Sequence, residues 1–401
     1  MRRTLLIAAR EHKGYSQADM AKALKTALRT YVRWEHGEVT PQPHHRAALR
    51  DQIGVDDAEL TRILAHIEDE EGLVDRRELL GAGFRIGVGA AMFATAPRRV
   101  GRSEIARVTD TAALITRWSR EYGGGGMPPE IMDAHVRWAA GLLHTSVPTP
   151  LRGPLFSAVG YLCAFAGFSR FDAYDHRQAR QLFAIAQQCA EEVGDWSLRA
   201  RAHGMAARQA IWIGDPDTGL THVELGLVRS DRITPTEVAA LHTLRARALA
   251  RLRRVEDARE ATGAADTAFA RRSPGDASPM AYYDEAQHRG DTGHALADLS
   301  RIGAPTDAAE RLAYSVRHHP AGTERARVMS QVELADLRLS TGEPEAAVEA
   351  IEIALPGAAE LRSARTRDLL QRVQRRAIAA PDGRAVTALR ERLAAHFEAA
   401  A

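Results

Sequence analysis

The chain has 401 residues, 45% of them hydrophobic, which is enough for two or three domains, or for a small domain and a repeat array, without disulfide or metal support. The formal net charge of +2 hides a local polarity: residues 1–50 carry ten Lys and Arg against four Asp and Glu, and residues 51–72 carry eight acidic residues against one arginine. This distribution predicts a polyanionic partner for the first fifty residues and argues against one for the balanced remainder.

Composition also narrows the fold class and the chemistry. Aromatic residues make up 5% of the chain, β-branched runs are short and apolar residues recur every three or four positions, which predicts an all-α protein. Cys163 and Cys189 match no metal or redox spacing, which favours two small core residues and a cytoplasmic location. His44 and His45 lack further ligands nearby, so no metal site is expected. Without a nucleophile elbow, phosphate loop or paired-carboxylate motif, we expect neither an enzyme nor a cofactor.

The first fifty residues carry the pattern of three short helices. The first covers residues 5–12, and Ser16 is the expected N-cap of a second that begins at Gln17. The third runs from about residue 27 to residue 35 and stops at Gly37.

The third helix has two different faces. Tyr31 and Trp34 are spaced to face inward, which leaves four residues outside: Leu28, Arg29, Val32 and Arg33. Two arginines four positions apart lie on one helix face, where each guanidinium can grip the O6 and N7 atoms of a guanine. The alternative is an ordinary solvated helix face.

The segments "YSQADMAKAL" and "RTYVRWEHG" resemble the helix-turn-helix of the xenobiotic-response-element family, relatives of the lambda and Cro repressors. The resemblance rests on Ser16, Gln17, Ala21, Leu24, Thr30, Trp34, Glu35 and Gly37. It implies a phosphate contact from Gln17 and base contacts from the outer face of the third helix. The complete predicted DNA-binding set is Gln17, Lys25, Thr26, Leu28, Arg29, Thr30, Arg33 and Arg46. For Arg46, a phosphate contact and plain surface placement are equally favoured.

The turn before the third helix departs from the family pattern. Lys25, Thr26 and Ala27 stand where the family usually has Gly-Val-Ser. The glycine that favours a left-handed backbone is therefore replaced, and the N-cap hydroxyl is lost unless Thr26 supplies it. If Thr26 supplies the N-cap hydroxyl, the third helix starts one residue earlier.

The sequence predicts a DNA-binding domain at residues 1–72 and a linker at residues 73–102. Residues 75–99 superficially imitate a twin-arginine signal or a membrane span. Their position and their glycines instead favour a linker with an apolar helix, residues 79–96, docked on the next domain. We also expect flexible breaks at residues 121–130 and 145–154.

Residues 103–401 contain a repeated pattern of a small residue, a large residue and a second small residue on one helix face. Its five copies begin at Ala179, Gly219, Ala258, Ala308 and Ala347, at intervals of 40, 39, 50 and 39 residues. Twelve residues before each lies a mostly small or apolar residue: Gly167, Ala207, Ala246, Leu296 and Ala335. The pattern resembles the tetratricopeptide repeat, in which helix pairs stack into a solenoid.

The inward-curving face of such a solenoid is the expected ligand site. The predicted residues are Tyr161, Phe168, Arg201, Arg208, Trp212, Arg247 and Arg251. Aromatic residues beside arginines suit a ligand with an apolar body and an anionic group. The competing interpretation is that the arginines are solvated and that Trp212 belongs to the core. Peptide-sensing relatives hold the peptide backbone with asparagine and this chain has none, which favours a small molecule or a protein partner over an extended peptide.

The whole arrangement resembles actinobacterial transcription regulators with a repressor-like head and a tetratricopeptide-like sensor. The resemblance implies a homodimer on a palindromic operator in double-stranded DNA, an effector, and no membrane contact. The alternative is a protein-interaction scaffold whose head does not bind DNA.

Overall fold

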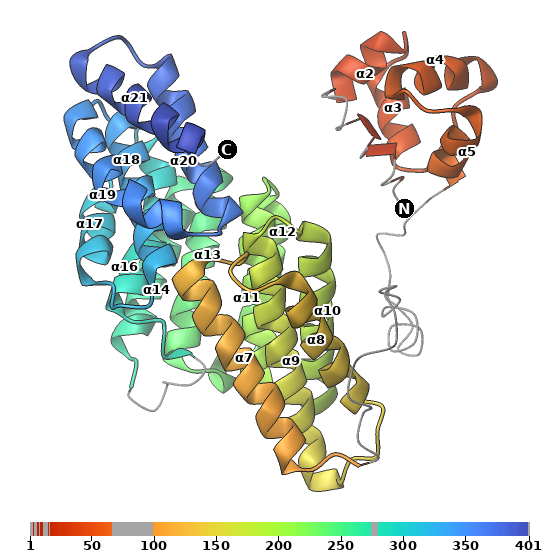
Figure 1. The fold of residues 1–401 in the computed structure, drawn as a ribbon, viewed down its shortest axis with the longest axis vertical. Helices are drawn as coiled ribbons and strands as arrows, with labels where there is room; N and C mark the ends of the chain where they lie inside the picture. The colour runs from red at the N-terminus through yellow and green to blue at the C-terminus, as the bar shows by residue number, and fades with distance from the viewer. Residues whose placement is uncertain are drawn as a thin grey trace. The chain divides into compact units, whose positions relative to one another are not determined.

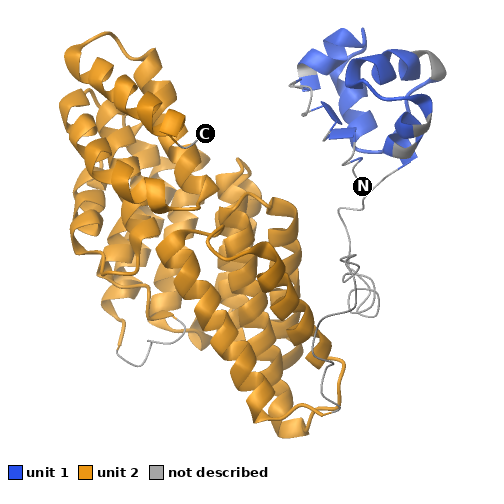
Figure 2. Cartoon of the chain, viewed as in Figure 1, with its two compact units in different colours: residues 1–89 blue, residues 90–401 orange. Residues whose placement is uncertain are grey.

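The computed structural model describes residues 3, 6–7, 9–10, 15, 17–65, 99–273 and 280–399. The described residues are helical apart from turns and one isolated β-bridge between Arg99 and Ser146, so the predicted all-α fold class is confirmed (Figure 1). The chain divides into two compact units, residues 1–89 and residues 90–401 (Figure 2). The predicted apolar helix at residues 79–96 lies outside the described residues, as does Ser16.

The first unit packs short helices around one core. Its helices are α2 (Gln17–Ala23), α3 (Leu28–Glu35), α4 (Pro43–Ile53) and α5 (Asp57–Ala65), and the described parts of residues 6–10 are helical as well. The buried residues at its centre are Leu6, Met20, Ala21, Leu24, Tyr31, Trp34, Leu49, Ile53, Leu60, Ile63 and Leu64. This core fixes α3 by one face only.

The turn between α2 and α3 keeps a left-handed backbone without a glycine. Lys25 has φ +50°, a region that costs a residue with a Cβ roughly 1–2 kcal/mol. Ala27 is the N-cap of α3 and no side chain accepts a hydrogen bond there. Of the two alternatives left open by the sequence, the uncapped helix starting at Leu28 is therefore the observed one, and Thr26 does not cap it.

The second unit is a run of paired helices that follows α7 (Arg102–Tyr122) and α8 (Pro129–Leu142). The pairs are α9 (Thr149–Asp172) with α10 (His176–Val193), α11 (Trp196–Trp212) with α12 (Pro216–Leu227), α13 (Pro235–Arg251) with α14 (Val255–Ala270), α16 (Glu285–Ser300) with α17 (Ala308–His318), α18 (Glu324–Ser340) with α19 (Pro344–Glu360), and α20 (Ala364–Ala379) with α21 (Arg384–Ala399). Successive pairs stack on one another, as in a helical repeat domain.

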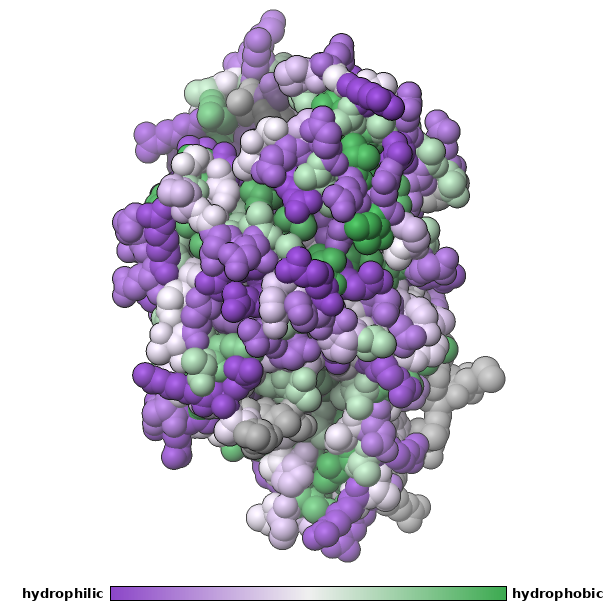
Figure 3. All heavy atoms as spheres, turned by 90° about the vertical axis from the view of Figure 1, so that its left-hand side faces the viewer, coloured by the Kyte–Doolittle hydropathy of each residue, from purple (hydrophilic) through white to green (hydrophobic). Residues whose placement is uncertain are grey.

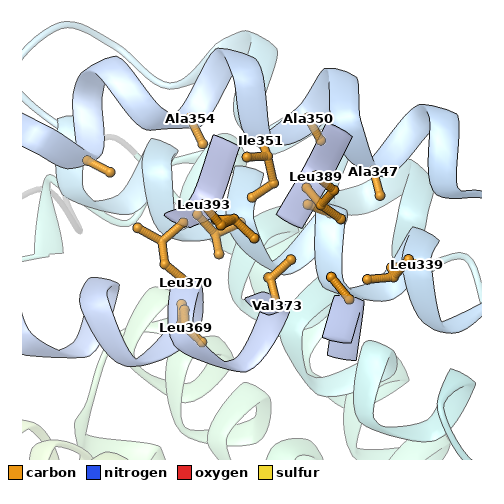
Figure 4. Packing of buried hydrophobic residues seen from close by; sticks show 14 of the residues in the cluster. Leu339, Ala347, Ala350, Ile351, Ala354, Leu369, Leu370, Val373, Leu389 and Leu393 are labelled. Carbon is orange, nitrogen blue, oxygen red and sulfur yellow. The ribbon is translucent and has the colours of Figure 1, made fainter. Parts of the chain in front are cut away.

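The repeated pattern has the register that the sequence predicts. Every copy lies on the second helix of its pair, every residue twelve positions earlier lies on the first, and all of these positions are buried. A Cβ added to Gly219 would lie 2.5 Å from Cγ1 of Ile211, so this crossing requires glycine. In the last pairs, Ile351 lies between Ala347 and Ala354 along α19 and meets side chains of α20 and α21 (Figure 4).

Helix α9 is the first helix of the first pair. Among the helices described here, it alone is long and apolar enough to cross a membrane, and half of that apolar stretch is buried inside the unit. It packs against both α10 and α7, which is typical of a core helix in a helical repeat protein. The face of the molecule in Figure 3 is mainly hydrophilic, with smaller hydrophobic groups interspersed.

Helix α7 joins an early and a late part of the repeat run, because it packs against both α9 and α18. The glycines after it form a packed turn, which corrects the expected flexible break at residues 121–130. The amide of Gly124 donates to Oδ2 of Asp172 (2.7 Å), and the amide of Arg362 donates to the carbonyl of Tyr122 (2.8 Å). A Cβ on Gly124 would collide with the carbonyl oxygen of Ser169. The second expected break is shorter than predicted, because α9 begins at Thr149 and contains Pro154.

Candidate DNA-binding surface and candidate ligand cavity

The outer face of α3 presents three of the four residues that the sequence places there, whereas Val32 is half-buried. Tyr31 is 0% and Trp34 2% exposed, whereas Leu28 is 48% exposed and Arg29 and Arg33 are also exposed. Burying one face against the core leaves the opposite face rigidly displayed. Such a helix can enter a DNA major groove.

The two outward arginines differ in their contacts. Nε of Arg33 lies 3.0 Å from Oε2 of Glu38, in a pair that is half exposed on both sides. Exposed pairs of this kind contribute little, about 0–1 kcal/mol, so a nucleic acid base can displace Glu38. Arg29 makes no hydrogen bond or ion pair to any described residue.

The remaining predicted DNA contacts lie in the turn before α3, in α3 itself and on α4. Lys25 is exposed at the turn, while Thr26 and Thr30 are half-buried. Arg46 is exposed on α4, and its Nε donates to the carbonyl of Pro41 (3.0 Å).

Gln17 has a contact that sequence reasoning missed. Its Nε2 donates to Oε2 of Glu35 (2.6 Å), and Nε of Arg10 donates to Oε1 of the same, fully buried carboxylate (2.6 Å). An amide nitrogen has two N–H groups, so the second one stays available for a phosphate. The network ties the start of α2 to the end of α3.

Arg3 makes further hydrogen bonds that the sequence did not predict. It is 2% exposed and donates to the carbonyl oxygens of Leu64 (2.7 Å), Trp34 (2.7 Å) and Val39 (2.9 Å). Its basic charge therefore serves the packing of the first unit and does not belong to the outer basic face.

The second unit contains a cavity of about 150 Å³. Its walls come from the first helices of the pairs, α9, α11, α13, α16, α18 and α20, and from α7. The first helices therefore form the inner face of the repeat run, and α7 covers part of it.

Four of the seven residues predicted to bind a ligand line this cavity: Phe168, Arg201, Arg208 and Arg247. Gly204, which lies between two of them on α11, also lines the cavity. The structure therefore brings together a core part of the predicted site.

The other three predicted residues lie away from the cavity wall. Trp212 lies behind the arginines, Tyr161 stacks on Phe165 with ring centroids 6.0 Å apart, and Nε of Arg251 donates to Asp298 (2.6 Å). Helical periodicity predicts which residues lie on the inner face, but it does not predict which turn of each helix lines the cavity.

Two of the lining arginines have good polar partners. Arg208 donates two hydrogen bonds to Asp291, at 3.3 and 2.9 Å. Burial alone raises the pKa of Asp291, but the charge and hydrogen bonds of Arg208 outweigh it and lower the pKa to about 2. Arg201 donates to the hydroxyl of Tyr282 (2.6 Å).

Two further lining arginines lack such partners. Arg247 is 6% exposed and makes no hydrogen bond or ion pair within the described part of the chain. Arg365 is 3% exposed, and its one ion pair with a described residue is a long one, 3.6 Å from Nη1 to Oδ1 of Asp172. Burial, reinforced by neighbouring arginines, lowers the pKa of Arg247 to about 10 and that of Arg365 to about 9.

Sequence reasoning missed Asp291, Arg325 and Arg365 as cavity residues. They come from α16, α18 and α20, far along the chain from the predicted set. The one available signal was the repeat register, which places the first helices of all pairs on the same inner face.

A family model described as helix-turn-helix matches residues 6–60, which cover α2, α3, α4 and the start of α5. The N-terminal unit is thus a helix-turn-helix domain of the xenobiotic-response-element type, and a large all-helical region follows it. No curated protein matches the chain.

Proposed function

We propose that this protein is a sequence-specific, DNA-binding transcription regulator that uses α3 to read the major groove. The observation that carries the proposal is the pair of exposed arginines, Arg29 and Arg33, on a helix whose opposite face is buried in a helix-turn-helix core. A guanidinium that bonds O6 and N7 of guanine supplies about 1–3 kcal/mol of discrimination.

The other residues divide by their chemistry. Leu28, exposed at the start of α3, suits the methyl group of a thymine, and Thr30 suits a base or phosphate beside it. Contacts to phosphates fall to Gln17, Lys25, Thr26 and Arg46, which set the register of the head on the duplex.

We also propose a homodimer on a palindromic operator. A single helix-turn-helix buries too little surface for tight and selective binding, so two heads on half-sites about one DNA turn apart are expected. Light scattering of the full-length protein with and without operator DNA measures the stoichiometry. A monomer bound alone to DNA would contradict the dimer.

The second unit is proposed to be a tetratricopeptide-like sensor, with no enzymatic role. Its cavity lies inside the unit, lined by six first helices and α7, which supports a small-molecule effector over an extended peptide. Helix α7 is also the first helix of this unit within the described residues. A ligand that changes how α7 packs can therefore bias the heads.

The rival function is an interaction scaffold whose head does not bind DNA. A mobility-shift titration of a palindromic promoter fragment from the host genome, repeated at several salt concentrations, separates the two. The regulator is expected to bind with an affinity that falls steeply with salt and that drops further in Arg29→Ala and Arg33→Ala. Absence of binding favours the scaffold, whereas binding that is the same in the parent and in both variants excludes α3 as the reading helix.

A further inference from the structure

Two arginines in the cavity carry buried charge without adequate polar contacts. Arg247 has no hydrogen-bond or ion-pair partner in the described part of the chain, and the Nε atoms of both Arg247 and Arg365 are buried and unbonded. Arg208, on the same cavity wall, has a carboxylate partner with two hydrogen bonds. Among the six arginines that line the wall, Arg208 is thus neutralised by a hydrogen-bonded carboxylate, whereas Arg247 and Arg365 are not.

An uncompensated charge inside a protein is expensive, and buried polar groups in native proteins are almost always hydrogen-bonded. Asp172 is the nearest acidic compensation for Arg365, and it is shared with Arg325, whose Nη1 lies 3.4 Å from Oδ1 of that carboxylate. One carboxylate thus faces two guanidinium groups. Burial is the main cause of the lowered pKa values of Arg247 and Arg365; Asp298 and Asp172, respectively, oppose it, and neighbouring arginines add to it.

The two arginines are held near one another by an aromatic ring. The guanidinium carbons of Arg247 and Arg365 lie 5.9 and 4.4 Å from the ring centroid of Trp212. Cation–π contacts hold each charge in place without neutralising it. Trp212 itself does not line the cavity, so its ring supports the two side chains from behind.

We propose that the cavity binds a small organic acid, with Arg247 and Arg365 holding its carboxylate. The apolar body lies against Phe165, Phe168, Leu241 and Leu244, which line the same hollow. A cavity of about 150 Å³ admits a body of roughly the size of benzene. This assignment rests on the proposed sensor role of the second unit and names the class of its effector.

The test uses the full-length protein with benzoate as the probe, followed by thermal unfolding and titration calorimetry. Benzoate is expected to raise the Tm in a concentration-dependent manner, whereas benzamide, of the same shape but uncharged, is not. Arg247→Met and Arg365→Met should each weaken benzoate binding by about tenfold or more. Arg245→Met is the matched control, since Arg245 lies on the same helix, pairs with Glu224 and does not line the cavity.

Phenyl phosphate and inorganic phosphate form the second arm. Binding of either with no binding of benzoate would replace the carboxylate class by a phosphate class and overturn the proposal. Equal binding of benzoate and benzamide, or benzoate binding unchanged in both arginine variants, would also overturn it.

Stability without ligand gives an independent readout. Removing an uncompensated buried charge is expected to raise the Tm, so Arg247→Met should melt about 2 °C or more above the parent. Arg208→Met should melt below the parent, because it strands Asp291 in the interior. A lower Tm in Arg247→Met would mean that this arginine is a structural residue and would contradict the assignment.

The test of the carboxylate site can fail or succeed independently of the test of DNA binding. Mobility shifts of operator DNA are measured without any organic acid, and benzoate binding is measured without DNA. DNA binding with no benzoate binding refutes the carboxylate site alone, while benzoate binding with no DNA binding refutes the regulator alone.

Discussion

Arg10 and Glu35 form a buried ion pair in the helix-turn-helix domain, with 2.6 Å between Nε and Oε1. Glu35 is the last residue of α3 and is fully buried, so the pair fixes the end of the recognition helix. Gln17 completes the site from α2. The geometry of the proposed DNA-reading face therefore depends on this polar contact as well as on apolar packing.

Breaking that pair from either side should destabilise the head strongly. Arg10→Met or Glu35→Leu removes the opposite charge from the other residue of the buried pair, at a cost of about 3–5 kcal/mol, whereas the double variant should cost much less than the sum. Hydrogen exchange of α3 amides in the full-length protein measures the effect locally. Additive losses in the double variant would show that the two residues do not act as a pair.

Replacing Lys25 by glycine is expected to raise the stability of the head and to lower its affinity for DNA. Lys25→Gly relieves the left-handed backbone strain at φ +50° and should stabilise the head by about 1 kcal/mol. Because it removes the phosphate contact proposed for Lys25, it should also weaken binding to all DNA sequences alike and reduce the salt slope by about one. Lys22→Ala controls for loss of charge without relief of strain. A salt slope that stays at the parent value would exclude the phosphate contact.

The pairing of Asp291 predicts a pH dependence in the second unit. Its folded pKa of about 2 lies below the ordinary 3.8, so the pair contributes stability above pH 4 that is lost as the pH falls toward 2. The contribution is about 2 kcal/mol by this shift. Unfolding free energy measured between pH 5 and pH 2 should fall more steeply in the parent than in Asp291→Asn. Equal slopes would show that the pair does not stabilise the fold.

The glycine turn after α7 offers a test of how tightly this helix is docked. Gly124→Ala places a Cβ against the backbone of Ser169 and should lower the Tm clearly. Gly263→Ala is the matched control, because Gly263 lies inside α14 with nothing within 4 Å of its added Cβ. That control should raise stability by about 0.5–1 kcal/mol. A harmless Gly124→Ala would mean that the turn tolerates movement of α7.

The elements that repeat were predictable from the sequence, and the contacts between distant elements were not. The fixed spacing of small residues predicts the helix pairs and their register, because that spacing reflects a local packing requirement. The packing of α7 against α18 has no local signal, and neither does the convergence of Arg365 with Arg247. The turn at Lys25 shows that a local residue preference can also mislead. Its backbone is left-handed although lysine replaces the glycine that favours this conformation, because tertiary packing holds the turn.

The central claim is that α3 reads DNA through Arg29 and Arg33, and selection from a DNA library with randomised half-sites tests it most directly. The full-length parent is expected to select a two-fold palindrome, and Gln17→Ala should bind all sequences more weakly without changing that choice. Arg29→Ala and Arg33→Ala should each lose about 1–3 kcal/mol and relax the preference at one position per half-site. If both arginine variants selected the parent palindrome with the parent affinity, the recognition-helix assignment would be wrong.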